Sequence, residues 1–291
     1  MRMSSKRTFN PARLTRDVVL YAILMVLVVV FGFPLLWTLS ASLKTIPEFA
    51  EYPPKLFPIS PQWINYWTVL NTPRVPVLTW LLNSSLVVVL TTIGTTLTSA
   101  LVAYSFARFN YRGRDFLFFI TLATMTLPAQ VTLIPQFILF FKMGMMNTLY
   151  PLWVPAWFGG GAFGIFMLRQ FFKSIPRDLD EAALIDGAGY PRIFWSILLP
   201  LLGPALATLA IITFIASWGD FQNPLLYLNS PDKFTVSIGL QFFNNAPEVG
   251  GVPMRHLLMA ACVMSMIPTV AIFFIGQRYF VQGVVMSGLK G

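Results

Sequence analysis

The chain has 291 residues, of which 56% are hydrophobic and only 11% charged, and its net charge is +9. Soluble domains carry about 25% charged residues, so this composition excludes an ordinary soluble domain and predicts an integral membrane protein. A single cysteine, Cys262, and a single histidine, His256, exclude a disulfide framework and a zinc site built from His and Cys.

Long gaps between charged residues mark the candidate spans, because few ionisable side chains survive inside a bilayer and a spanning helix needs about 20 residues. The chain has six such gaps, which predict an all-α membrane protein with six transmembrane helices. The expected spans are 18–41, 81–106, 116–141, 148–168, 198–219 and 257–277. The first gap is too long for a signal-peptide core and lacks a small-residue cleavage site, so we expect it to be retained. A transmembrane domain, 17–280, is then flanked by an N-terminal segment, 1–16, and a C-terminal tail, 281–291.

Six spans place both termini on one side of the membrane, and the distribution of Lys and Arg indicates which side. Fourteen of the 20 cations fall on one face: Arg2, Lys6, Arg7, Arg13, Arg16, Arg108, Arg112, Arg114, Arg169, Lys173, Arg177, Arg192, Arg278 and Lys290. This bias predicts a multi-pass protein of the bacterial inner-membrane type with both termini in the cytoplasm. Anionic lipid headgroups and the same bias explain the net positive charge without nucleic acid.

The second to fourth spans contain residues that pack or bend helices. Span 81–106 is rich in Ser, Thr, Gly and Ala, so we expect it to face protein more than lipid. Pro128 predicts a kink or break in the third span, and Pro151, Pro155 and glycines 159–161 predict an irregular fourth span. Such breaks are tolerated where protein covers them or where they line a wet cavity. They therefore fit a transport pathway and plain packing equally well.

The segment 178–200, DLDEAALIDGAGYPRIFWSILLP, brings charge and glycine between two apolar runs. Asp178 as N-cap and Glu181 three residues later form a capping-box pattern. Gly187 and Gly189 would end that helix and turn the chain, and the following proline would open a second short helix. The pattern predicts two short helices on the cytoplasmic side. An amphipathic helix resting on the lipid headgroups is the alternative.

The spacing of this segment carries a specific resemblance. Written as EAA-x3-G-x9-I-x-L-P, the motif is filled by Glu181, Ala182, Ala183, Gly187, Ile197, Leu199 and Pro200. The run resembles the signature of permease subunits of binding-protein-dependent ABC importers. The stretches NSSLVVVLTTIGTTLTSALVAYSFARF and RYFVQGVVMSGLKG resemble the smaller permease subunit of carbohydrate importers of the maltose type. The resemblance implies a transport subunit, with no catalytic residue and no enzymatic activity of its own.

In that family the loop is a coupling helix that docks onto an ATPase. The resemblance implies the ATPase-coupling residues Glu181, Ala182, Ala183, Asp186 and Gly187, the small alanines allowing one helix face to seat closely against another protein. It also implies an ATPase-contacting tail consisting of Ser287, Gly288, Leu289, Lys290 and Gly291. The implied partners are a second permease subunit, an ABC ATPase dimer, an extracytoplasmic solute-binding protein, a carbohydrate substrate and membrane lipid. No cofactor is expected on this chain, because ATP and Mg²⁺ would be bound by the ATPase subunit.

Two further expectations concern the spans themselves. Trp218, Gln222 and Asn223, near the outer end of the fifth span, combine an aromatic platform with amide donors and acceptors, which suits a sugar in the substrate pathway. The alternative is a tryptophan of the interfacial belt beside a polar loop. The small-residue face of the second span, which includes Gly94, is expected to pack against protein, so Gly94→Leu is predicted to weaken assembly with the partner permease.

Two other functions fit the sequence less well than an importer. A secondary carrier would need an ionisable residue inside the membrane, and the six gaps contain none. An intramembrane enzyme would need paired acids, a His with a nucleophile or metal ligands, and the span serines lack such partners in sequence. The chain has no G-x-x-x-x-G-K-[ST] phosphate loop. The sequence leaves the sugar unidentified and keeps a polyol or glycerol phosphate open as the substrate.

Overall fold

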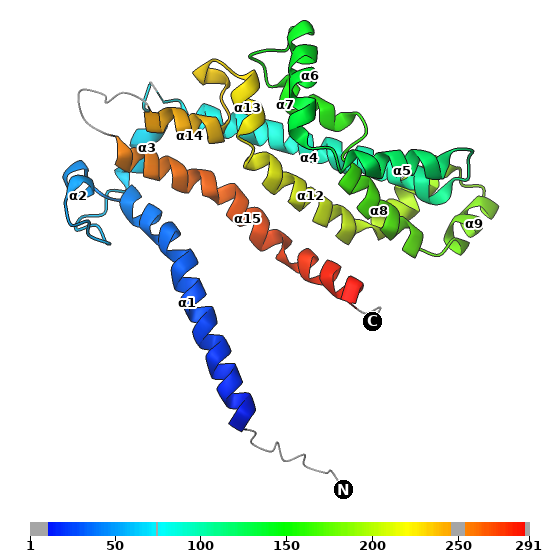
Figure 1. Ribbon diagram of the computed structural model, residues 1–291, viewed down its shortest axis with the longest axis horizontal. Helices are drawn as coiled ribbons and strands as arrows, with labels where there is room; N and C mark the ends of the chain where they lie inside the picture. The colour runs from blue at the N-terminus through cyan, green and yellow to red at the C-terminus, as the bar shows by residue number, and fades with distance from the viewer. Residues whose placement is uncertain (1–10, 74, 246–253, 289–291) are drawn as a thin grey trace. The chain divides into compact units, whose positions relative to one another are not determined.

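The computed structural model describes residues 11–73, 75–245 and 254–288, with side chains described between 16 and 277 (Figure 1). The regular elements within these ranges are all helices, which confirms the predicted all-α class. Two compact units make up the chain. The first comprises residues 1–69 and 247–263, and the second comprises residues 70–246 and 264–291.

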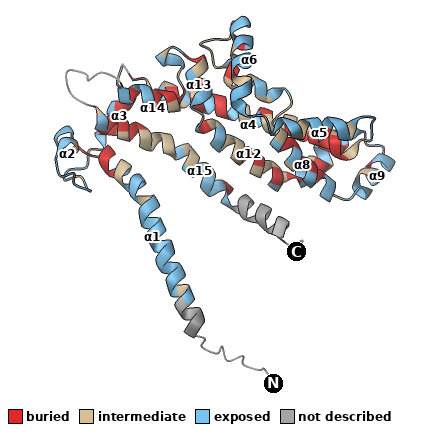
Figure 2. Cartoon of the chain, in the orientation of Figure 1, coloured by how far each residue is buried: buried red, intermediate tan, exposed pale blue. Residues whose placement is uncertain are grey.

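The first unit contains α1 (Pro11–Ser42), α2 (Ile46–Ala50), most of α3 (Ile64–Leu70) and the start of α15 (Arg255–Gly288). Apolar side chains along α1 are exposed, which suits a helix surrounded by lipid (Figure 2). The Nδ2 atom of Asn65 donates to the carbonyls of Ser42, at 2.9 Å, and Lys44, at 3.0 Å. These two bonds hold the start of α3 to the chain that leaves α1.

The core of the second unit forms around α4 (Val77–Arg108), against which α8 (Ala162–Ser174) and α12 (Gly203–Trp218) pack most extensively. Small side chains permit this close approach, since Ala100 and Ala103 are fully buried on α4. Figure 2 shows buried segments along these helices. The prediction that the second span faces protein is confirmed.

Gly94 packs within the chain. A Cβ atom at this position would lie 2.6 Å from Nε1 of Trp157. Trp157 ends the 3₁₀ helix η1 (Val154–Trp157), and its Nε1 donates to the carbonyl of Leu90 at 3.1 Å. The small-residue face at Gly94 thus packs against protein as predicted, here an indole of the same chain, and the effect of Gly94→Leu on assembly with a partner permease stays a prediction.

Four helical segments are long and apolar enough to cross a membrane: Arg16–Ser42, Val77–Arg108, Tyr150–Ser174 and Arg255–Gln277. They overlap the predicted first, second, fourth and sixth spans. The other two predicted spans coincide with helix pairs bent by 96° and 78°, each of which passes the same test only as a pair. The described residues thus contain four spans, or up to six if each bent pair is one span, and the count of six stays a prediction.

The 96° bend lies at the predicted proline. Helix α5 (Arg114–Thr124) ends before it, and Pro128 is the N-cap of α6 (Ala129–Lys142) with extended backbone angles, φ −60° and ψ 133°. A proline inside a continuous helix would remove a backbone hydrogen bond and clash with the preceding turn. The predicted break near Pro128 is confirmed.

The fourth and fifth segments are also irregular. After α7 (Tyr150–Trp153) and η1, the chain turns through Gly159 and Gly160, whose φ angles are 104° and 62°, before α8 begins. This confirms the expected irregularity of the fourth span. The fifth segment joins α10 (Tyr190–Ile193), the π-helical turn η2 (Phe194–Leu198), α11 (Leu199–Leu201) and α12, and the remaining helices are α13 (Gln222–Tyr227), η3 (Pro231–Lys233) and α14 (Val236–Asn245).

Candidate functional site

The motif segment forms the helix α9 (Asp178–Ile185), followed by a turn and α10. Its first turn carries Asp178, Asp180 and Glu181, whose negative charges are stabilised by the positive end of the helix dipole. The predicted capping box is wrong. The N-cap is Arg177, which makes no side-chain cap bond, and its carbonyl accepts from the amide of Glu181 at 3.1 Å. Because Arg177 already has helical backbone angles, Asp178 falls inside the helix and cannot cap it.

The C-terminus of α9 closes with a Schellman motif. The amide of Gly187 donates to the carbonyl of Leu184 at 3.0 Å, and the amide of Ala188 donates to the carbonyl of Ala183 at 2.9 Å. Gly187 has φ 79°, a left-handed conformation that favours glycine. Pro191 lies in the first turn of α10. The predicted turn at Gly187 and the second short helix opened by a proline are both confirmed.

The two motif alanines lie on different sides of α9. Ala183 is buried in a core cluster that includes Leu168 and Phe172 of α8. Ala182 is exposed, so only one alanine is available to a partner. The seating of Ala183 against its own chain was not expected. Ala183 is buried because it supplies the apolar contact by which α9 packs against α8.

An exposed stripe runs along the opposite side of α9. We call it the α9 stripe, and it consists of Asp178, Glu181, Ala182 and Ile185. Spacings of three and four residues place these side chains on one helical face. Ile185 is 86% exposed, although isoleucine is among the residues most often buried. The remaining coupling residue of the sequence prediction, Asp186, is the exposed C-cap of the helix.

An ion pair ties α9 to the end of α4. Arg108 Nε lies 3.0 Å from Asp180 Oδ2, and the two side chains are only 6% and 16% exposed. The atoms are close but not aligned for a hydrogen bond, whereas Arg108 Nη2 donates to the carbonyl of Ile175 at 3.0 Å. Burial raises the pKa of the Asp180 carboxyl above its ordinary value, and the Arg108 guanidinium opposes that rise.

Aromatic rings attach α10 to the same helix. The ring of Tyr104, on α4, lies 5.1 Å from that of Phe194 and 5.6 Å from that of Phe172, and its hydroxyl donates to the carbonyl of Tyr190 at 3.4 Å. Phe109 completes the set, 5.0 Å from Tyr190. The α9–α10 loop is also held to α4 and α8 by the buried core cluster that contains Ala183 of α9 and Ile193 of α10.

The structure places the three residues predicted for the substrate pathway in different surroundings, and their contact with a substrate stays a prediction. The Trp218 side chain is buried, its ring stacks on Phe214 at 5.8 Å, and its Nε1 donates to the carbonyl of Ser265 at 3.0 Å. Gln222 and Asn223 are exposed in the first turn of α13. The amide side chain of Asn223 is already bound by Asp220, with 2.8 Å between Nδ2 and Oδ2.

The comparisons with known proteins agree with the motif. Residues 96–286 match the model of the family described as "Binding-protein-dependent transport system inner membrane component". This match covers well over half of the chain. The chain belongs to this family. As a binding-protein-dependent permease it is a membrane transport protein, and this membership favours the importer over the secondary carrier and the intramembrane enzyme.

Several curated permeases are similar over most of the chain. The trehalose/maltose transport system permease protein MalG of Thermococcus litoralis is 33% identical over 93% of this chain and 95% of its own. The arabinooligosaccharides transport system permease protein AraQ of Halalkalibacterium halodurans is 35% identical over 73% of this chain and 74% of its own. A chain from the crystal structure of a bacterial ABC transporter that imports the acidic polysaccharide alginate shares the fold, with a TM-score of 0.84, 23% identity and coverage of 94% and 100%.

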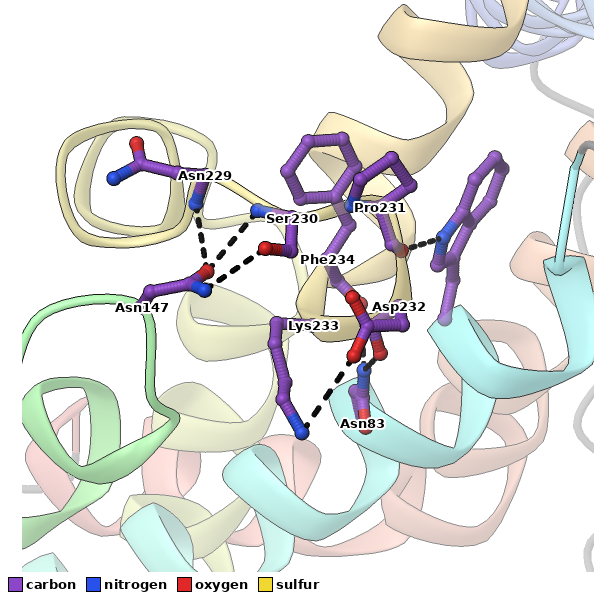
Figure 3. Close-up of polar contacts among 9 residues, drawn as sticks. Asn83, Asn147, Asn229, Ser230, Pro231, Asp232, Lys233 and Phe234 are labelled. Atoms are coloured by element: carbon purple, nitrogen blue, oxygen red, sulfur yellow. Dashed lines mark hydrogen bonds and ion pairs between the residues drawn. The ribbon is translucent and has the colours of Figure 1, made fainter.

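Sequence reasoning missed a polar scaffold at residues 229–234 of this permease (Figure 3). Asn147 Oδ1 accepts from the amides of Asn229 and Ser230, both at 3.0 Å, and its Nδ2 donates to Ser230 Oγ at 2.8 Å. Asn83 Nδ2 donates to the carbonyl of Phe234 at 2.9 Å. Asn147 has φ 56°, which a few residue types other than glycine adopt. Asparagine at a turn was the available signal, but nothing in the sequence indicated its distant partner.

The C-terminal tail of the permease lies at the limit of the described residues. Ser287 and Gly288 are the last residues of α15, and only their helical backbone is described. Leu289, Lys290 and Gly291 lie outside the described residues altogether. The tail contact with an ATPase therefore stays a prediction. Among the described residues, no group of three or more His, Cys, Asp or Glu side chains could hold a metal ion.

Proposed function

We propose that this permease forms half of the translocation pathway of an ATP-driven importer for a sugar or oligosaccharide. The observation that carries the proposal is the α9 stripe, an exposed helical face mounted on buried contacts to α4 and α8. Relatives named for trehalose and maltose, arabino-oligosaccharides and diacetylchitobiose support the substrate class. A second permease would complete the pathway, and an extracytoplasmic binding protein would deliver the solute.

The proposed partner of the α9 stripe is an ATPase subunit that binds ATP and Mg²⁺ and performs the hydrolysis. Ile185 offers an apolar contact at the centre of such an interface, and Ala182 lets the partner approach the helix closely. Movement of the ATPase would displace α9. The Arg108–Asp180 pair and the buried Ala183 would then carry the displacement into α4 and α8.

The proposal includes an orientation. The α9–α10 loop, the end of α4 and both termini would face the cytoplasm, as the Lys and Arg distribution indicates. Loop 229–234 would then lie on the extracytoplasmic side. With Cys262 replaced by serine, single cysteines at positions 182 and 229 test this arrangement, because a membrane-impermeant thiol reagent added to intact cells should label only the second. Labelling of the first alone would overturn the orientation.

The coupling role is tested by two neighbouring substitutions on α9. Ile185→Ser removes the most exposed apolar side chain of the α9 stripe, and Leu184→Ser makes the same change at a position 41% exposed that lies off the stripe. We expect Ile185→Ser to weaken co-purification of the ATPase and binding-protein-stimulated ATP hydrolysis in reconstituted vesicles. Leu184→Ser should retain both. Equal behaviour of the two variants would contradict a docking role for the stripe.

A further inference from the structure

A basic cluster lies where α5 and α8 meet, and it shares no residue with the α9 stripe. Arg114 and Asp115 open α5, and Arg169 and Lys173 are one turn apart near the end of α8. The Arg169 side chain is only 9% exposed, and its Cζ atom lies 3.9 Å from the centre of the Phe118 ring. A guanidinium held on an aromatic face has a fixed position.

The carboxylate of Asp115 is the counter-ion of this cluster. Asp115 accepts from Arg114 Nε at 2.9 Å and from Arg114 Nη2 at 3.1 Å, and Arg169 Nη2 lies 4.0 Å from the same carboxylate. Lys173 is exposed and makes no ion pair within the part of the chain that the structure describes, although it interacts electrostatically with Asp115. The three cations and the one anion leave an excess of two positive charges in the cluster.

We propose that Arg114, Arg169 and Lys173 bind the phosphate headgroup of an anionic phospholipid. Basic pockets between spans on the cytoplasmic side are typical sites for such headgroups. The guanidinium fork of arginine matches phosphate oxygens, and lysine adds a point charge. The same helix, α5, also exposes Phe116 and Phe119, each 67% exposed, and these rings offer apolar surface to acyl chains near the headgroup.

The apolar surface favours a lipid over an acidic protein segment. A phospholipid joins an anion to hydrocarbon, and α5 carries both a cation of the cluster, Arg114, and the exposed rings of Phe116 and Phe119. An acidic loop of a partner subunit would match the charges but would leave these rings uncovered. The site is independent of the proposed coupling at α9, which uses other residues.

The test uses the full chain in its native complex, reconstituted into nanodiscs of phosphatidylcholine with a minor fraction of phosphatidylglycerol. The ratio of the two lipids retained after detergent washing is measured by mass spectrometry. A cation near a lipid surface contributes roughly fivefold to the affinity for an anionic lipid, so Lys173→Gln should lower the enrichment of phosphatidylglycerol roughly fivefold. Raised salt should weaken the enrichment in the wild type.

Arg192→Gln is the matched control, because Arg192 is an exposed cation of α10 with no ion pair among the described residues. It should leave the lipid ratio unchanged. The proposal is overturned if Lys173→Gln retains the wild-type ratio or if Arg192→Gln lowers it equally. It is also overturned if a photo-crosslinker placed at Lys173 captures a protein subunit and no phospholipid.

Discussion

Replacement of Gly187 tests how far the α9–α10 loop depends on one backbone conformation. With φ 79°, Gly187 lies in the left-handed region, and no atom lies within 4 Å of the position that a Cβ would occupy. A new side chain would therefore meet open space, and its cost is the backbone strain alone, about 1–2 kcal/mol for an ordinary residue. Asparagine tolerates this region better, and a β-branched valine tolerates it worst.

The alternative to strain is loss of the turn. The chain would then give up the two Schellman bonds, from Gly187 to Leu184 and from Ala188 to Ala183, which are worth about 1 kcal/mol each. Gly187→Ser either keeps the turn with strain or gives up its two bonds. In both cases the turn loses at most about 2 kcal/mol of stability, which lowers the population of the native turn about 30-fold. Gly187→Asn should lower the stability of the turn by less than Gly187→Ser does. Gly187→Val should abolish transport.

The assay is ATPase co-purification together with binding-protein-stimulated hydrolysis in reconstituted vesicles. Gly189→Ser provides the matched control, because Gly189 is the N-cap of α10 with φ −77°, and serine is favoured at that position. We expect the order of activity to be Gly189→Ser, then Gly187→Asn, then Gly187→Ser. The reasoning is refuted if serine is equally damaging at both glycines, or if asparagine and serine behave alike at Gly187.

Three further substitutions probe contacts that the structure assigns. Gly94→Leu drives a side chain into the indole 2.6 Å away, so it should destabilise the chain by about 1–3 kcal/mol in thermal unfolding; intact stability with loss of the partner permease would contradict this. Asp180→Asn leaves its arginine partner without a counter-ion and should speed hydrogen exchange across α9. Because burial raises the pKa of the Asp180 carboxyl, the folded state keeps that proton to a higher pH than the unfolded state, and wild-type stability relative to Asp180→Asn should fall as the pH rises above 3.8. Asn147→Gly keeps the left-handed turn but removes three hydrogen bonds, so exchange should rise at residues 229–234; unchanged exchange there would show that the scaffold is not held by this side chain.

The sequence predicted features that depend on local chemistry. Charge-free gaps located the apolar helices because ionisable groups are costly in lipid. Pro128 marked the break between α5 and α6 because proline cannot donate a helical hydrogen bond. Gly187 marked the turn because a left-handed residue favours glycine.

Features that depend on distant partners were beyond the sequence. The burial of Ala183 and the pairing of Asp180 with Arg108 require knowledge of where α9 lies against α4. Trp218 carried a plausible chemistry for sugars, yet its indole nitrogen is bound to α15. The hydrophobic pattern identifies the apolar residues of each helix, but it does not indicate which other helix packs against each of them.

The π-helical turn η2 lies between α10 and α11, and it sets how the side chains of α10 are rotated relative to those of the helices that follow. The amide of Leu199 donates to the carbonyl of Phe194, five residues earlier, so this turn contains one residue more than an α-helical turn. Each residue of an α-helix advances the side-chain direction by about 100°. Deleting a single residue here, such as Ser196, would therefore turn the face of α10 that buries Ile193 away from the direction in which α12 buries Leu209. The count of residues between Gly187 and Ile197 in the motif thus sets an angle as well as a length, and a one-residue insertion or deletion would misalign the loop even with every motif side chain present.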